Sequence, residues 1–249
     1  MNKPSTSCTL QGTLFGIGVG PGNPDLLTLQ AIKRLGEVDI ILAAASPRNE
    51  QSIALSIAQP HLRRNVGTLR LDFPMTRDKA TLETAWENNA RLTLEVLNSG
   101  KNAAFLTLGD PLVYSTFGYL MRTLKRLDPE LCVHITPGIT SFQEAAARTG
   151  TILCEGKQAL HILPGIIEEE ELHTCLGTGG NAVILKAYRN LPAIRKGLKK
   201  TGREKDCVFV SRLGLDGEII QYGLAGLDTP NYLSLILAPA EGKKTPNAE

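Results

Sequence analysis

Several common signatures are missing from this chain of 249 residues, and each absence removes a class of protein. No uninterrupted apolar run approaches membrane-spanning length, so we expect no transmembrane helix. Lys and Arg number 27 against 25 Asp and Glu, a near balance that offers no global field to nucleic acid or to a membrane surface. The polar start, residues 1–11, lacks the apolar region of a secretory signal. The sequence therefore predicts a soluble, cytoplasmic protein without a nucleic-acid or membrane partner.

Signatures of metal and nucleophilic catalysis are also missing. The five cysteines are scattered, odd in number and free of any Cys-x-x-Cys pair, which argues against disulfides or a zinc site and for a reducing compartment. The four histidines show no ligand spacing, so we expect no metal. Neither Gly-x-Ser-x-Gly nor His-Glu-x-x-His occurs. No catalytic residue can be singled out, and the residues indicate a ligand that is bound largely by backbone groups.

Short β-rich runs alternate with amphipathic helical patterns along the chain, which predicts an α/β fold. In the first half the expected strands are 14–19, 39–44, 66–71, 103–108 and 132–136, and the expected helices are 25–36, 50–59, 78–98 and 115–127. In the second half the expected strands are 158–163, 181–185, 207–211, 218–222 and 232–237, and the expected helices are 140–148, 168–175 and 190–200. The late strands follow one another directly, so we expect a mostly parallel N-terminal sheet and a mixed C-terminal sheet. The predicted domains are 12–137 and 138–240, with flexible tails at 1–11 and 241–249.

The most informative segment is the glycine-rich stretch 16–28, which follows an apolar run and leads into a helical pattern. Glycines between a strand and a helix let backbone N–H groups approach a ligand closely. A dinucleotide fingerprint fails because Pro21 or Asn23 stands where a glycine is needed, and no lysine is present for a phosphate-binding loop. A ligand loop of another kind and a simple tight turn both remain open.

Two further turns follow predicted strands, at 108–111 (Leu-Gly-Asp-Pro) and 136–141 (Thr-Pro-Gly-Ile-Thr-Ser). Taken alone, Asp110 could be a helix cap and Pro137-Gly138 a routine turn. Ligands of open α/β sheets bind beyond the carboxyl ends of the strands, and all three turns are expected there. Together they favour a shared pocket.

In order and spacing, the three segments resemble those of the tetrapyrrole methylases, a superfamily that uses S-adenosylmethionine. The resemblance spans about residues 13–237, and five segments are similar to precorrin-2 C20-methyltransferases in particular: 73–78, 109–116, 137–143, 145–150 and 183–186. It implies two α/β domains with the cofactor in the cleft between them, usually in a homodimer. Carried over by position, it implies cofactor contacts from Pro21, Leu108, Gly109, Asp110, Val113, Thr140, Ser141, Lys186, Val208, Phe209 and Ser234.

The implied activity is methyl transfer to C20 of precorrin-2 or cobalt-precorrin-2 in cobalamin biosynthesis, with S-adenosylhomocysteine as the second product. Positioning the reactants and excluding water would suffice, since the methyl group is already activated. The substrate carries several carboxylates, for which the candidate partners are Arg48, Arg77, Arg189 and Arg212. Two alternatives stay open: a methylase of the same fold with another acceptor, and a non-catalytic tetrapyrrole carrier.

Overall fold

The computed structural model describes residues 11–45, 52–177 and 179–240. The chain forms two compact units, residues 1–140 and 141–249, and each is described by itself. The predicted tails lie outside the described residues except for Gln11, whose side-chain amide donates hydrogen bonds to Asn98 (3.0 Å) and Asp128 (2.8 Å). Among the described residues, no helix is both long and apolar enough to pass through a bilayer.

The first unit is built on a five-stranded parallel sheet in the order β3-β2-β4-β1-β5. Its strands are β1 (Leu14–Gly18), β2 (Ile40–Ala45), β3 (Gly67–Asp72), β4 (Ala103–Thr107) and β5 (Val133–Thr136). Its helices are η1 (Pro24–Leu26), α1 (Leu29–Leu35), α2 (Ile53–Ala58), η2 (Gln59–His61), α3 (Lys79–Asn98) and α4 (Phe117–Leu127). Each predicted strand and helix of this half is present, which confirms the α/β class and the parallel sheet.

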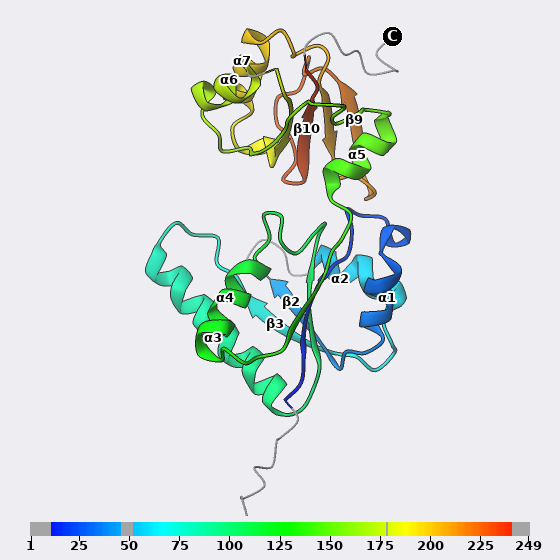
Figure 1. Ribbon diagram of the computed structural model, residues 1–249, viewed down its shortest axis with the longest axis vertical. Coiled ribbons are helices and arrows are strands. Elements are labelled where there is room, and N and C mark those ends of the chain that lie inside the picture. The colour runs from blue at the N-terminus through cyan, green and yellow to red at the C-terminus, as the bar shows by residue number, and fades with distance from the viewer. Residues whose placement is uncertain (1–10, 46–51, 178, 241–249) are drawn as a thin grey trace, which may run out of the picture. The chain divides into compact units, whose positions relative to one another are not determined.

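Helices cover both faces of this sheet, α1 and α2 on one and α3 and α4 on the other (Figure 1). Successive strand residues point to opposite faces, so the two buried clusters alternate along β1. Phe15 and Ile17 join the cluster under α1 and α2, whereas Leu14 joins the cluster under α3 and α4. Gly16 leaves room for the Phe117 ring, because a Cβ at Gly16 would lie 2.3 Å from that ring. The central strands β1 and β4 are therefore buried throughout.

The segment after β1 differs in detail from the single helix predicted at 25–36. It begins as the short 3₁₀ turn η1, capped by Asn23, and α1 starts only at Leu29. Thr28 has an extended backbone, and its side chain accepts a hydrogen bond from the Ala31 N–H at 3.1 Å, as an N-cap does. A second capping side chain thus divides the predicted helix.

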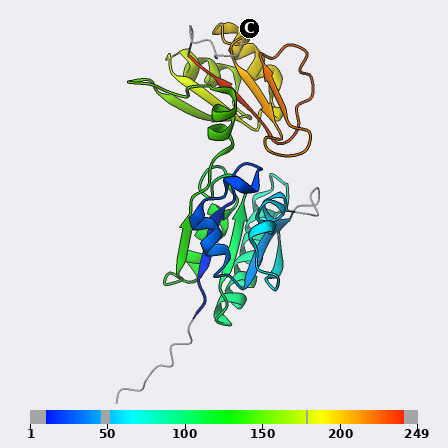
Figure 2. The same cartoon turned by 90° about the vertical axis from the view of Figure 1, so that its right-hand side faces the viewer.

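The second unit contains a mixed sheet in the order β6-β7-β10-β8-β9, in which only β6 and β7 run parallel (Figure 2). Its elements are α5 (Ser141–Thr149), β6 (Leu160–Pro164), α6 (Glu169–Gly177), β7 (Asn181–Leu185), η3 (Ala187–Arg189), α7 (Leu191–Lys200), β8 (Val208–Ser211), β9 (Ile219–Tyr222) and β10 (Ser234–Ala238). The antiparallel pairings of the late strands confirm the predicted mixed sheet.

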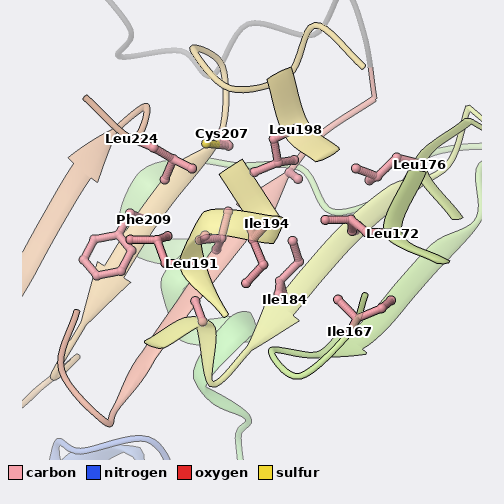
Figure 3. Packing of buried hydrophobic residues seen from close by; sticks show 14 residues of the cluster. Ile167, Leu172, Leu176, Ile184, Leu191, Ile194, Leu198, Cys207, Phe209 and Leu224 are labelled. Carbon is pink, nitrogen blue, oxygen red and sulfur yellow. The ribbon is translucent and has the colours of Figure 1, made fainter. Parts of the chain in front are cut away.

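One face of this second sheet packs against α6 and α7 in an apolar core of its own (Figure 3). Leu172 and Leu176 of α6 and Ile194 and Leu198 of α7 are almost fully buried there. Gly197 allows the two helices to approach closely, because a Cβ at Gly197 would lie 2.8 Å from the Leu172 side chain. This core packs against β7 and β10, at whose ends the predicted site residues Lys186 and Ser234 lie.

Candidate functional site

The strand order of the first unit has a topological switch point at β1 and β4. These neighbouring strands continue to opposite sides, since β1 leads through α1 to β2 and β4 leads through α4 to β5. The two connections also lie on opposite faces of the sheet (Figure 1). In open α/β sheets, ligands bind where the direction of the chain reverses in this way. The fold therefore points to the turns after β1 and β4.

Three glycines from these turns and from the turn after β5 pack backbone against backbone. A Cβ at Gly138 would lie 2.1 Å from the Gly109 carbonyl oxygen and 2.8 Å from Gly18 Cα. A Cβ at Gly18 would in turn lie 2.5 Å from the Gly109 oxygen. We call Gly18, Gly109 and Gly138 the glycine cradle. No other residue type fits at Gly18 or Gly138 without moving a neighbouring main chain, so these glycines are required by packing.

A short β-bridge ties the turn after β1 to the turn after β4. The N–H of Gly109 donates to the Gly20 carbonyl at 2.8 Å, and the N–H of Gly20 donates to the Gly109 carbonyl at 3.4 Å. Both residues are left-handed, with φ of 79° at Gly20 and 73° at Gly109. A side chain would strain this conformation, so glycine is needed here for its backbone freedom.

Asp110 holds the second turn against the third. Its Oδ1 accepts a hydrogen bond from the Leu112 N–H at 2.8 Å, and its Oδ2 accepts one from the Gly138 N–H at 3.1 Å. Each carboxylate oxygen is thus used by a backbone donor, an arrangement that stabilises a turn. Asp110 therefore ties the turn after β4 to the turn after β5.

The other predicted first-unit residues surround the cradle. Pro21 and Thr140 are buried, whereas Leu108 and Val113 are half-buried. The same β4–α4 loop exposes two large apolar side chains, Leu112 and Tyr114, which are 60% and 48% accessible. An apolar rim beside a backbone cradle fits a ligand that is held by main-chain groups and covered by apolar contact.

Tyr114 is a further feature of this loop, and no sequence motif marks it. Its backbone is left-handed at φ 50°, a conformation that is uncommon outside glycine and costs free energy. Partial burial raises the pKa of its phenol above the ordinary value, so the phenol keeps its proton at neutral pH. Such strain at a strand-end loop is typical of functional sites.

The predicted residues of the second unit divide between the end of its sheet and its core. Lys186 directly follows β7, and Ser234 begins β10, where its Oγ accepts a hydrogen bond from the Tyr188 N–H at 3.1 Å. Ser141 begins α5. Phe209 lies in the core under α7 (Figure 3), whereas Val208, the residue before it on β8, points to the other face of the sheet. Any ligand contact from Phe209 would therefore use its main chain.

The candidate arginines lie in different places. Arg77 is exposed just before α3, and Arg48 lies outside the described residues. Arg189 lies in η3 with its guanidinium carbon 5.0 Å from the centre of the Tyr188 ring. Arg212 follows β8, and its Nε donates to the Asp216 carbonyl at 2.5 Å. Arg189 and Arg212 both belong to the sheet end that carries Lys186 and Ser234.

Two cations at this sheet end have strained backbones. Lys186 after β7 has φ 58°, and Arg212 after β8 has φ 52°. The strand between β7 and β8 is β10, which starts with Ser234, so the two cations flank one strand. With Tyr114, they are the non-glycine residues with positive φ in the described part of the chain. Tyr114 lies in the loop after β4, Lys186 follows β7 and Arg212 follows β8. Lys186 and Arg212 are predicted site residues, and Tyr114 is next to the predicted Val113.

A cavity of about 550 Å³ lies elsewhere in the first unit. Arg63, Arg64 and Lys101 line it together with Asp39, at the amino ends of β2, β3 and β4. Because the glycine cradle lies at the carboxyl ends, this cavity belongs to the opposite edge of the sheet. Within the described ranges, no group of three or more His, Cys, Asp or Glu side chains could hold a metal ion.

Comparison with known proteins finds relatives that match most of the chain. It is 34% identical to a cobalt-precorrin-2 C(20)-methyltransferase of Salmonella typhimurium, covering 84% of this chain and 87% of the relative. It is 32% identical to a precorrin-2 C(20)-methyltransferase of a Sinorhizobium species, covering 92% and 95%. The cobalamin biosynthesis protein CobIJ of Mycobacterium tuberculosis is 33% identical over 92% of this chain, which spans about half (46%) of that longer relative.

Solved structures agree on the fold. A uroporphyrin-III C-methyltransferase of Thermus thermophilus, determined in complex with S-adenosylhomocysteine, superposes with a TM-score of 0.65 at 22% identity, covering 91% of this chain and 97% of that one. The family model of the tetrapyrrole (corrin/porphyrin) methylases matches residues 13–227, which include every strand of the first sheet and the glycine cradle. The chain therefore belongs to the tetrapyrrole methylases.

Proposed function

We propose that the protein transfers a methyl group from S-adenosylmethionine to C20 of precorrin-2 or of cobalt-precorrin-2, in cobalamin biosynthesis. The observation that carries this proposal is the likeness to relatives named for the C20 reaction, at 32–34% identity and over most of both chains. One of these relatives is named for each form of the substrate, so both forms belong to the proposal.

The first-unit residues suit the proposed cofactor. In the glycine cradle, main chain packs against main chain with no side chain between the turns, and Asp110 fixes the turn that carries Gly109. Leu112, Tyr114 and the half-buried Val113 offer apolar surface beside it. We propose that Pro21, Leu108, Gly109, Asp110, Val113 and Thr140 contact the cofactor, which supplies a methyl group already activated on a sulfonium. In the Thermus relative the product form of this cofactor is bound.

The second-unit contacts, at Ser141, Lys186, Val208, Phe209 and Ser234, remain predictions from the resemblance. So do the carboxylate contacts of Arg48, Arg77, Arg189 and Arg212. The Arg212 guanidinium is held on one side, because its Nε donates to the Asp216 carbonyl. Substituting each arginine with glutamine should raise the KM for the tetrapyrrole more than the KM for the cofactor.

We also propose a homodimer in the cytoplasm, as the resemblance implies. Sedimentation of the active protein at micromolar concentration tests the first point, since a stable and active monomer would contradict it. Fractionation of the source cells tests the second.

The decisive experiment combines the protein with isotopically labelled S-adenosylmethionine and each form of the substrate. We expect one labelled methyl group on the pigment by mass spectrometry, and NMR should place it at C20. A methyl group on another carbon would identify a methylase of the same fold with a different acceptor. Tight pigment binding without any methylated product would identify a carrier. The ratio of kcat/KM between the two substrates would show which form is preferred.

A further inference from the structure

The cavity at the amino ends of β2, β3 and β4 is a second candidate site, and all of its lining residues belong to the first unit. It measures about 550 Å³. One water molecule takes about 30 Å³ in the liquid, so this space is much larger than a single bound water needs. Small-molecule sites measure about 300–1,000 Å³. The cavity is therefore large enough for a ligand of its own.

Hydrogen bonds between the strand ends fix the main chain around this cavity. The Gly67 N–H donates to the Asp39 carbonyl at 2.9 Å, and the Asp39 N–H donates to the Asn102 carbonyl at 2.9 Å. The Asn102 N–H donates in turn to Asp39 Oδ2 at 2.9 Å. Gly12 packs against Lys101, since a Cβ at Gly12 would lie 1.9 Å from the Lys101 carbonyl oxygen. A main chain that is already ordered lowers the free-energy cost of binding a ligand beside it.

The charged side chains around the cavity are unequally paired. Nη2 of Arg63 donates to the Val38 carbonyl at 2.5 Å and lies 3.8 Å from Asp39 Oδ1, so Arg63 and Asp39 form an ion pair. Arg64 and Lys101 also line the cavity, and both are exposed. The ion pairs and side-chain hydrogen bonds found within the described part of the chain involve neither of them. Two cations therefore face this cavity without an acidic partner.

The lining of the cavity favours acidic groups over rings. Ile40 is the one apolar side chain among the described residues that line it, and none of those residues is aromatic. Sites for ring-containing ligands have mostly apolar and aromatic walls, which this cavity does not offer. A guanidinium pairs with a carboxylate or a phosphate through parallel N–H bonds, and an ammonium attracts either group as a point charge. Two unpaired cations in one cavity suit a molecule with more than one acidic group.

We propose that this cavity binds a compact polyanion, a molecule that carries two or more carboxylate or phosphate groups. Arg64 and Lys101 contact its acidic groups, and the Arg63–Asp39 ion pair forms the wall beside them. The glycine cradle lies at the carboxyl ends of the strands, so this ligand occupies the opposite edge of the sheet. The site goes beyond the proposed function, because its occupation requires no methyl transfer.

The first test measures the binding of citrate and of tripolyphosphate to the full chain by isothermal titration calorimetry, with acetate as the monovalent comparison. We expect one of the two polyanions to bind with a stoichiometry of one per chain and about tenfold or more tighter than acetate, because a second charge-assisted contact is made. Tighter binding of citrate would assign the site to polycarboxylates, and tighter binding of tripolyphosphate would assign it to polyphosphates. If neither bound more tightly than acetate, the proposal would be overturned.

A matched pair of double variants tests whether the cavity is responsible. Arg64→Gln/Lys101→Gln removes the two unpaired cations, whereas Lys79→Gln/Arg91→Gln removes two exposed cations of α3 that do not line the cavity. Both variants change the net charge equally. We expect the cavity variant to bind the preferred probe about 10- to 100-fold more weakly and the α3 variant to stay within about twofold of the wild type. Urea unfolding followed by Trp86 fluorescence should show that both are folded. An equal loss of binding in both would reveal attraction by overall charge alone and would refute the site.

Asp39→Asn provides a test of the opposite sign. Its amide oxygen can still accept the Asn102 N–H, but the described lining of the cavity loses its carboxylate. Removing this negative charge should tighten binding of the preferred probe by about two- to fivefold, the usual size of an exposed charge interaction. Weaker or unchanged binding would contradict a polyanion in this cavity.

Competition separates this inference from the proposed function. A saturating amount of the preferred probe should leave the Kd for S-adenosylmethionine unchanged, because the cavity and the glycine cradle lie at opposite edges of the sheet. A competitive loss of cofactor binding would place the probe at the cofactor site and would overturn the inference. If the protein methylated neither form of the substrate, the proposed function would fail, whereas the binding of citrate or tripolyphosphate would still be decided by the paired variants.

Discussion

The glycine cradle makes a sharp prediction about Gly138→Ala. A single methyl group at this position would lie 2.1 Å from the Gly109 oxygen and 2.8 Å from two Gly18 main-chain atoms. None of these atoms belongs to a flexible side chain, so relief requires the turn after β5 to move away from the ends of β1 and β4. Inserting atoms into a well-packed region costs about 1–3 kcal/mol, and we expect the upper part of this range.

A loss of about 3 kcal/mol lowers the ratio of folded to unfolded first unit by about 100-fold, since each 1.4 kcal/mol is a factor of ten. Trp86, the chain's single tryptophan, reports on this unit because it lies on α3 and stacks on Tyr119 at 4.6 Å. Urea unfolding followed by its fluorescence should show a lower midpoint with an unchanged slope. Calorimetry of the folded variant should show weakened binding of S-adenosylmethionine.

Gly118→Ala provides the matched control. Gly118 lies in α4, and a Cβ there would meet only the far end of Arg122 at 3.6 Å, an ordinary contact. Alanine is the better helix former, so this variant should be as stable as the wild type or gain about 0.5–1 kcal/mol. If Gly138→Ala unfolded at the wild-type midpoint and bound the cofactor normally, the close packing of the three turns would be refuted.

Three further outcomes are expected. The amide of Asp110→Asn keeps only one of the two acceptor oxygens, so this variant should destabilise the first unit by about 1–3 kcal/mol. Calorimetry should also show weaker cofactor binding. Unchanged binding would contradict the role of Asp110 in holding the two turns together. Burial raises the pKa of the Cys207 thiol to about 12, so at pH 8 iodoacetamide should label the exposed Cys132 and Cys154 but not Cys207 in the native protein, as peptide mass spectrometry would show. Phe209→Ala should destabilise the second unit by about 3–5 kcal/mol in urea unfolding followed by circular dichroism, whereas Ile219→Ala, at a half-exposed position on the neighbouring β9, should cost far less.

The sequence was sufficient for most of the fold because its local signals agree with its tertiary structure. Asp78 stands at the start of the helix expected at 78–98, and its Oδ2 accepts a hydrogen bond from the Thr81 N–H at 2.8 Å. Pro192 falls in the first turn of α7, where its missing N–H costs nothing. Helix boundaries were less certain where two capping residues compete, as Asn23 and Thr28 do before α1.

The reasons for individual glycines could not be predicted from sequence. At Gly109 the nearest protein atom, Thr140 Cα, lies 3.9 Å from a built Cβ, so packing within the protein does not demand glycine there. The left-handed backbone, with a φ of 73°, does. The close approach belongs to Gly18 and Gly138, which meet only because β1 and β5 pair across more than a hundred residues.

The left-handed backbones of Lys186 and Arg212 could not be predicted from the sequence either. Nothing in the local sequence marks Lys186 or Arg212 as left-handed, because neither Asn nor Gly stands at these positions. At Lys186 a distant residue takes part, because Gly165 packs against the Lys186 carbonyl. Only the resemblance drew attention to Lys186, and only the structure shows how it is held.

The strand order of the first sheet has a consequence for how this unit is made. β1 is the first strand synthesised, but its two neighbours are β4 and β5, so it pairs with residues about 90 to 120 positions later. Contacts this distant in sequence form slowly, because the entropy cost of closing a long loop comes before the favourable contacts are made. While the ribosome is still making α4, β1 therefore has one open edge and the third glycine of the cradle does not yet exist. We expect the ligand site to be the last part of this unit to mature, and a nascent chain that stops before Gly138 to be unable to bind the cofactor.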